Sequence, residues 1–426
     1  MIQTSLAATG LLLLTAGAPR ALPMAPGTED ALRPADHEAL GKVLSAYVDA
    51  YTKNKKIDAA RSNVAEELDK FRKRLKNRDP LSLTPDLGKA IWESMNYETA
   101  KGVKKGKVSE VKFSNAEMGM ELSYAVWAPA KYEPKKPYPL ILCIPDKGER
   151  PVDHLTEKWI SPEIRDNAVL AAVPMPADEA LWGEAGSEGK WGGGAHLLTV
   201  FRDMSRTYAT DFDRVFIAGR GVGVAAAMTI ASRSPDRYAG ILGRSGDMGE
   251  MACENFKNLP TFFAGAGGGA SAFGEKCTKA GYDNCTIKPE GTEEDVWSWI
   301  KDHPRISYPN HVVLLPGIQI PNKAYWLGVQ PWDGQGKALV EGKIDRATNT
   351  ITITGEGVTT IYLFFNDVLV DLDKPVKVVC NGAEHTDVIP RNLGTMLDFL
   401  TSGRSDPGKL YIATKDYDLP AKPKPK

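Results

Sequence analysis

Between residues 107 and 303 the sequence alternates short apolar runs with stretches of helical spacing, and this alternation limits the fold more than any other feature. A chain that alternates strands and helices packs as a mostly parallel sheet with helices on both faces. We expect strands at Val108 to Phe113, Met120 to Trp127, Pro139 to Ile144, Ala168 to Val173, Val215 to Ala218, Ala239 to Leu242, Thr261 to Ala264 and Cys285 to Lys288. We expect helices at Ala195 to Tyr208, Val222 to Ser232, near Ala270 to Ala280, and at Glu293 to Lys301.

The segments on either side of this unit have different patterns. Residues 35–100 are expected to form a helical N-terminal segment. Two runs of helical spacing within Leu40 to Leu75 predict an amphipathic helical pair that packs on its own chain or on a partner. Residues 306–415 read as a small β-rich C-terminal domain, with a hairpin at Asn381-Gly382 and one helix at Leu393 to Leu400. The Lys/Pro-rich tail, residues 416–426, is expected to be disordered. The C-terminal strands are expected at His311 to Leu315, Ala324 to Val329, Lys337 to Ile344, Thr350 to Thr354, Thr359 to Phe365 and Val376 to Cys380.

The first residues resemble an export signal. An apolar run from Leu6 to Ala18 is followed by small residues, although no Lys or Arg precedes it. The run is too short to cross a bilayer as a helix. We therefore expect residues 1–21 to be a signal peptide, the protein to be secreted or periplasmic, and no membrane span to remain after cleavage. The net charge is −1 with both signs mixed, so nucleic acid is not an expected partner.

The segment most informative about function reads DFDRVFIAGRGVG from Asp211, and it continues through SPDRYAGIL. It places Gly219, Gly221 and Gly223 in a turn between a strand and a helix. This order resembles the nucleophile elbow of the α/β-hydrolase superfamily, especially secreted esterases of the polyhydroxybutyrate-depolymerase and feruloyl-esterase type. The stretches HPRISYPNHVVL, AYWLGV and VTTIYLFFNDVLVDLDKPVKVVCNG resemble the C-terminal extension of a bacterial group of such proteins. The resemblance implies an α/β-hydrolase-type sheet followed by a β-rich unit.

The same segment lacks the nucleophile of those esterases. They carry G-x-S-x-G, whereas Gly221 stands here at the central position. The elbow strains its central residue to expose the side chain, and glycine adopts that backbone but supplies no attacking oxygen. Loss of a triad nucleophile typically costs on the order of 10⁶ in turnover. Acyl transfer through this residue is therefore excluded.

The other triad positions are also empty in the sequence. The resemblance implies an acid after Thr261 to Ala264 and a histidine after the last strand, but residues 265–272 contain no carboxylate and residues 289–292 no histidine. The oxyanion loop, residues 144–148, keeps Gly148 and has no histidine, and His303 follows the last helix, where a connector role is expected. The sequence therefore predicts a catalytically inactive α/β-hydrolase-fold protein of the cell envelope that binds a ligand or a partner and needs neither a cofactor nor a metal.

Two enzymatic or cofactor-binding alternatives compete with this prediction. A dinucleotide loop at the three glycines fails because Val224 stands where G-x-G-x-x-G requires a small residue. An active ester or peptide hydrolase would need a displaced nucleophile, for which Ser245 is the candidate, with His196 or His154 as base. The competing interpretation is that Ser245 caps a following turn or helix.

Binding functions remain for the rest of the crevice. Trp182 and Trp191 lie in a long glycine-rich loop and, with Gly148, are candidates for binding a small ester, a glycan or a polymer. The alternative is that the tryptophans pack into the fold. A third interpretation is an envelope structural or interaction protein that uses the helical pair and the C-terminal β unit. Of the five cysteines, Cys277 and Cys285 are the nearest pair for a disulfide, and burial as small apolar residues is the alternative.

Overall fold

The computed structural model describes residues 31–115, 120–187, 190–265, 267–317, 322–330, 334, 336–402 and 406–422. The expected signal peptide and the last four residues of the tail lie outside these ranges. Among the described residues, no helix is long and apolar enough to cross a membrane. All five cysteines are unbridged, so Cys277 and Cys285 do not form the disulfide considered above.

The central unit is built on an eight-stranded sheet within the described residues, in the order β1-β2-β4-β3-β7-β8-β9-β10. The pairs β1–β2 and β2–β4 are antiparallel and every later pair is parallel. This arrangement confirms the predicted α/β-hydrolase-type sheet. Its strands are β1 (Ser109–Asn115), β2 (Met120–Trp127), β3 (Tyr138–Ile144), β4 (Val169–Ala172), β7 (Thr210–Arg220), β8 (Gly240–Arg244), β9 (Thr261–Ala264) and β10 (Cys285–Lys288).

Helices cover both faces of this sheet. Along β3, Leu140 and Leu142 pack into one core while Ile141 and Cys143 pack into the other, as alternation in a strand requires. The first core includes side chains of α6 (Gly193–Thr207), α7 (Gly223–Ser232) and α8 (Gly268–Lys279). The second includes side chains of α4 (Pro151–Glu157), α5 (Pro162–Asn167) and α9 (Glu293–Asp302). A short hairpin of β5 (Gly186–Ser187) and β6 (Lys190–Trp191) stands apart from the sheet.

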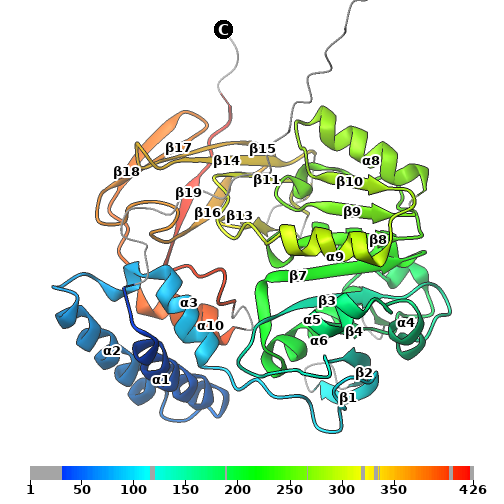
Figure 1. The fold of residues 1–426 in the computed structure, drawn as a ribbon. Coiled ribbons are helices and arrows are strands. Elements are labelled where there is room, and N and C mark those ends of the chain that lie inside the picture. The colour runs from blue at the N-terminus through cyan, green and yellow to red at the C-terminus, as the bar shows by residue number, and fades with distance from the viewer. Residues whose placement is uncertain are drawn as a thin grey trace, which may run out of the picture.

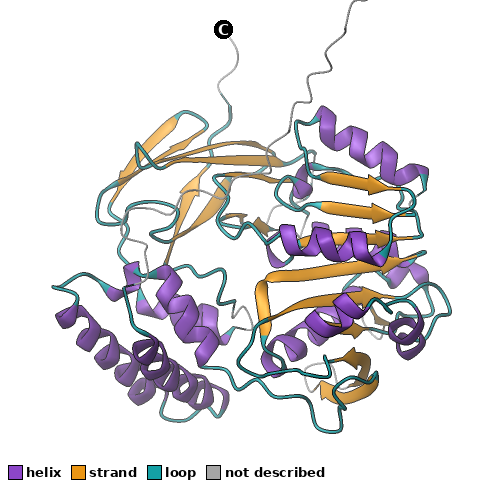
Figure 2. Cartoon of the chain, in the orientation of Figure 1, coloured by secondary structure: helices purple, strands orange, loops and turns teal. Residues whose placement is uncertain are grey.

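The C-terminal part forms two smaller sheets, which Figure 2 shows as a second group of strands beside the large sheet. One sheet has the order β11-β14-β15-β17-β18 and the other β12-β13-β16-β19. The Asn381-Gly382 turn joins β17 and β18, which confirms the predicted hairpin. The strands of these two sheets are β11 (His311–Leu314), β12 (Lys323–Ala324), β13 (Leu327–Val329), β14 (Leu339–Asp345), β15 (Thr350–Glu356), β16 (Thr360–Phe365), β17 (Val376–Cys380), β18 (Ala383–Asp387) and β19 (Ala413–Asp418).

Strand β19 corrects the predicted start of the tail. The sequence predicts disorder from residue 416, but β19 pairs with β16 as far as Thr360 and Asp418. Tyr417 is buried, and its hydroxyl lies 3.0 Å from Asp387 Oδ2. Pairing and burial of alternate side chains therefore keep residues 416–418 in the fold.

The N-terminal helices pack on the C-terminal sheets. Helices α1 (Pro34–Thr52), α2 (Ile57–Arg74) and α3 (Thr84–Glu93) lie beside α10 (Leu393–Thr401), as Figure 1 shows. Leu40, Val64 and Leu87 belong to the same apolar core as Trp326 and Leu363 of the C-terminal part. The apolar faces of the predicted helical pair are thus covered by the protein's own chain. The remaining short turns of 3₁₀ helix are η1 (Pro80–Ser82), η2 (Glu179–Leu181), η3 (Pro235–Arg237) and η4 (Glu254–Phe256).

A buried ion cluster connects the central unit to the C-terminal part. The carboxylate of Asp236, the middle residue of η3, pairs with Lys323 at 2.8 Å and with Lys409. Burial alone raises the pKa of Asp236, but attraction to the two ammonium groups outweighs it and holds this pKa well below its usual range. These three side chains therefore act as an electrostatic link between segments far apart in the sequence.

Candidate functional site

The glycine turn keeps the backbone of a nucleophile elbow. Strand β7 ends at Arg220, Gly221 has φ +52°, and α7 begins at Gly223. A Cβ on Gly219 would overlap the carbonyl of Gly223, and a Cβ on Gly223 would lie 2.6 Å from the Ile144 carbonyl oxygen. All three glycines are therefore required by the left-handed turn and by the close approach of strand and helix.

The space in front of Gly221 is filled by the carboxylate of Asp146. A Cβ on Gly221 would overlap the Cγ and both carboxylate oxygens of this side chain. Asp146 Oδ1 accepts hydrogen bonds from the N–H groups of Val222, at 3.1 Å, and Lys147, at 2.8 Å. In α/β-hydrolases the oxyanion hole consists of the N–H that follows the nucleophile and an N–H from the loop after the third strand. In this chain the N–H groups at the corresponding turn and loop are those of Val222 and Lys147, and the Asp146 carboxylate accepts both.

Charged neighbours hold Asp146 in place. The Arg220 guanidinium lies 3.8 Å from Asp146 Oδ2 and 3.7 Å from Glu149 Oε2. Glu149 also accepts hydrogen bonds from the Asp146 N–H, at 3.1 Å, and from His154 Nδ1, at 2.9 Å. Burial raises the pKa of Glu149, but these bonds outweigh burial and lower it below its usual range. Asp146 therefore belongs to a network of charged and hydrogen-bonded groups with Arg220, Glu149 and His154.

His154, one of the two predicted bases, is part of this network and is buried. Its Nε2 lies 3.1 Å from the indole nitrogen of Trp159, which can only donate, so Nε2 is the acceptor and Nδ1 carries the proton toward Glu149. Burial lowers the pKa of His154, which favours this neutral ring. Both nitrogens are thus occupied, and His154 is not placed to act as a base for Ser245.

Ser245, just after β8, and His196, on α6, lie in separate parts of the central unit. Ser245 is exposed at the end of β8, with φ +48°, and its N–H donates to the carbonyl of Ala264 at 2.8 Å. His196 Nε2 donates to the carbonyl of Ser123, at 3.0 Å, on β2. Strand β2 is separated from β8 by three strands in the sheet order. The structure therefore brings neither predicted histidine to Ser245.

The predicted ligand-binding residues are divided between core and surface. Trp182 is buried, and its indole N–H donates to the Pro176 carbonyl at 2.8 Å. Trp191 is half-buried, and its ring makes an edge-to-face contact with the His196 ring, with 5.7 Å between the ring centroids. Gly148 has φ +73° and open space around it, close in sequence to Asp146. Trp182 therefore serves packing, as in the alternative interpretation of this loop.

The described residues after β9 and β10 carry neither the expected acid nor the expected histidine, although the Asp247 carboxylate, which follows β8, lies against Gly267 and Gly269. Strand β9 leads into Gly265, with φ +64°, and β10 leads into the turn before α9 without a histidine. Glu293, at the start of α9, is paired with Arg244 at 3.0 Å and accepts a hydrogen bond from the Ser161 N–H. His303 stacks on Trp299 at 4.2 Å, in agreement with its expected connector role. No group of three or more His, Cys, Asp or Glu among the described residues is arranged to hold a metal ion.

Sequence reasoning missed the two arginines that follow neighbouring strands. Arg220 ends β7 and Arg244 ends β8, and the two are register partners in the parallel pair. Arg244 lies over the Trp159 ring at 4.5 Å. The signal available in the sequence was an arginine at the carboxyl end of each of two consecutive predicted strands.

Comparisons with known proteins find similarity at the level of structure. No family model and no curated protein matches the chain. A thermostable esterase of known structure aligns with 47% of this chain and 64% of its own, at 18% identity and a TM-score of 0.39. The ferulic acid esterase Fae1A of Anaeromyces mucronatus aligns with 49% of this chain and 94% of its own, at 10% identity and a TM-score of 0.37. An S-formylglutathione hydrolase of Staphylococcus aureus aligns with 45% and 98%, at 10% identity and 0.36.

Proposed function

We propose that this chain is a catalytically inactive α/β-hydrolase-fold protein whose former oxyanion hole is closed by its own Asp146. The observation that carries the proposal is the position of that carboxylate, bonded to the Val222 and Lys147 N–H groups and overlapping the place of a side chain at 221. An oxyanion hole stabilises developing negative charge on the substrate. A resident carboxylate both occupies the donors and repels that charge.

The loss of the remaining catalytic groups supports the same proposal. Gly221 has no side-chain oxygen, His154 is locked between Glu149 and Trp159, and Ser245 has neither histidine beside it. The apolar segment before residue 21 supports export, so we place the protein in the cell envelope or outside the cell, where it would bind a ligand or a partner.

Active-site labelling tests the proposal. The purified full chain is incubated with a fluorophosphonate probe and weighed by intact mass spectrometry, alongside Ser245→Ala and an active serine esterase as positive control. We expect no adduct on the wild type, and p-nitrophenyl ester hydrolysis at the background rate for the wild type and for Gly221→Ser. One adduct per chain that disappears in Ser245→Ala would establish the displaced-nucleophile hydrolase instead.

A further inference from the structure

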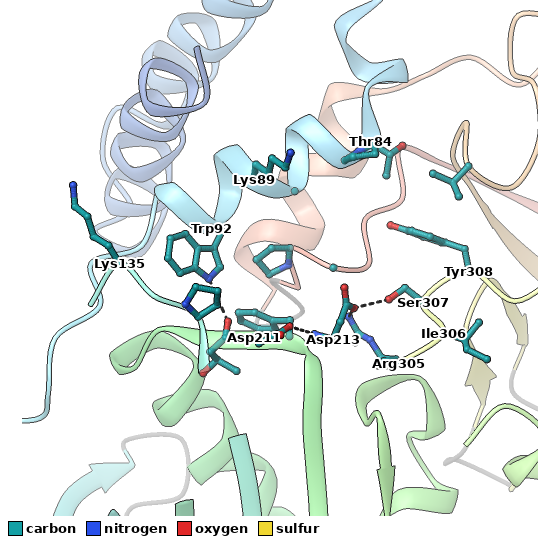
Figure 3. Close-up of a pocket in the computed structure, with 18 residues that line it drawn as sticks. Thr84, Lys89, Trp92, Lys135, Asp211, Asp213, Arg305, Ile306, Ser307 and Tyr308 are labelled. Atoms are coloured by element: carbon teal, nitrogen blue, oxygen red, sulfur yellow. Dashed lines mark hydrogen bonds and ion pairs between the residues drawn. The ribbon is translucent and has the colours of Figure 1, made fainter. Parts of the chain in front are cut away.

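A pocket of about 590 Å³ opens at the other end of β7 from the glycine turn. It lies between α3, the start of β7 and the segments 305–308 and 407–408, as Figure 3 shows. Because β7 has 11 residues that each rise about 3.3 Å, roughly 30 Å separates the two ends. The pocket is therefore distinct from the site closed by Asp146, and its volume falls in the range of small-molecule sites.

The walls of the pocket are largely apolar, and hydrogen bonds and ring contacts with neighbouring residues hold them in position. The Trp92 indole N–H donates to the Thr210 carbonyl at 3.2 Å, and its ring packs on Tyr97 at 4.9 Å. The Tyr308 hydroxyl accepts from the Leu410 N–H at 2.6 Å. The apolar residues of the lining are Pro85, Trp92, Pro137, Phe212, Ile306, Tyr308, Val368 and Pro407. A rigid wall of this kind suits a flat or apolar ligand body.

The floor of the pocket carries an incompletely compensated carboxylate. Arg305, whose side chain is 1% exposed, is shared between Asp406 and Asp213 Oδ1, so this triad has a net charge of −1. Ser307 also donates to Asp213 Oδ1, at 2.9 Å. Within the described part of the chain, Asp213 Oδ2 accepts no hydrogen bond, and 44% of the side chain is exposed. Figure 3 shows the Asp213 carboxylate rising from β7 into the space below α3.

A second polar group is left without a partner at the same pocket. Thr84, on α3, lines it and is 3% exposed, yet its hydroxyl oxygen has no hydrogen-bond partner in the described structure. A buried hydroxyl without a partner costs free energy, which a ligand that reaches it would recover.

We propose that this pocket binds a small primary monoamine with an aromatic or apolar body. The ammonium group donates to Asp213 Oδ2, and the body packs against the Trp92 and Tyr308 rings and the neighbouring prolines. Aromatic faces beside a carboxylate favour an organic cation twice, by ion pairing and by attraction to the ring faces. Lys135 also lines the pocket, so a second positive charge on the ligand meets repulsion. The inference does not depend on whether the protein is catalytically active.

Isothermal titration calorimetry of the full chain tests this with three ligands of matched shape, 2-phenylethylamine, 2-phenylethanol and phenylacetate. We expect one saturable site for the amine, at least tenfold weaker binding of the alcohol, and no binding of the acid. Asp213→Asn should weaken amine binding at least tenfold. Asp283→Asn is the matched control, because Asp283 is exposed and does not line the pocket, so it should leave binding unchanged.

A monoamine site is refuted if the amine does not bind at millimolar concentration, if amine and alcohol bind equally, or if the acid binds best. If Asp213→Asn does not fold because Arg305 loses a partner, Trp92→Leu on the opposite wall decides, with thermal unfolding as the check of folding. Undiminished amine binding to folded Trp92→Leu would also overturn it.

Discussion

A double-mutant cycle between residues 146 and 221 gives the sharpest test of the closed oxyanion hole. Asp146→Ala removes a carboxylate that accepts two backbone N–H bonds. Hydrogen bonds to charged groups contribute about 1.5–3 kcal/mol each when buried, but this side chain is 37% exposed, so we expect a loss of about 1.5 kcal/mol in total.

Gly221→Ala adds two costs at once. A left-handed backbone costs an L-residue about 1–2 kcal/mol, and the new Cβ also expels Asp146, which forfeits the same ~1.5 kcal/mol. The single variant should therefore lose about 3 kcal/mol by these terms. The double variant should lose about 3 kcal/mol as well, because the Asp146→Ala change has already removed the carboxylate that the new Cβ would displace. The expected coupling between the two sites is thus about 1.5 kcal/mol.

Urea unfolding followed by circular dichroism measures all four proteins under the same conditions. Independent sites add within about 0.3–0.5 kcal/mol, so the cycle distinguishes contact from independence. Additive losses for Asp146→Ala and Gly221→Ala would refute the placement of the carboxylate in the turn.

Three further predictions concern stability. Asp236→Asn should destabilise the fold by about 3–5 kcal/mol, because it leaves the buried Lys409 ammonium and the partly buried Lys323 ammonium without their carboxylate. Since the pKa of Asp236 is lowered in the folded state, its contribution to stability is complete above pH about 4 and is lost as the pH falls further. Between pH 2 and 5, acid should therefore lower the melting temperature of the variant less than that of the wild type. His154 also has a lowered folded pKa, so stability should fall as the pH drops below about 6.5, and pH-dependent denaturation of His154→Gln should lack this decline. Gly382→Ala should cost about 1–2 kcal/mol because φ is +91°, whereas Gly249→Ala, with equally open space and no positive φ, should be neutral in the same urea assay.

Most of the central fold could be predicted because its signals are local. The strand limits of β2, β9 and β10 coincide with the prediction. Helix α3 lies within the segment expected to be helical, but its own limits were not predicted, because a ten-residue helix has too short a periodic pattern to stand out. Strand β7 begins at Thr210, before its apolar run, because its first residues already pair with β3, where Thr210 is the partner of Tyr138.

The site was only half predictable. The absence of a serine at Gly221 can be read directly from the sequence, but the filling of that space depends on how the loop after β3 approaches the turn after β7. Asp146 and Gly221 are 75 residues apart by their numbers, and no local pattern connects them. For the same reason, the partners of His154 and the burial of Trp182 follow from tertiary packing rather than from composition.

The core shared by α1–α3 and the C-terminal sheets has a consequence for biogenesis. During synthesis the first helices emerge well before the strands that cover them, since the whole α/β unit lies between. Their apolar faces stay accessible until the last strands leave the ribosome, and closing so long a loop is slow. Truncation at either end uncovers the same surface, so shortened chains should recruit chaperones or aggregate.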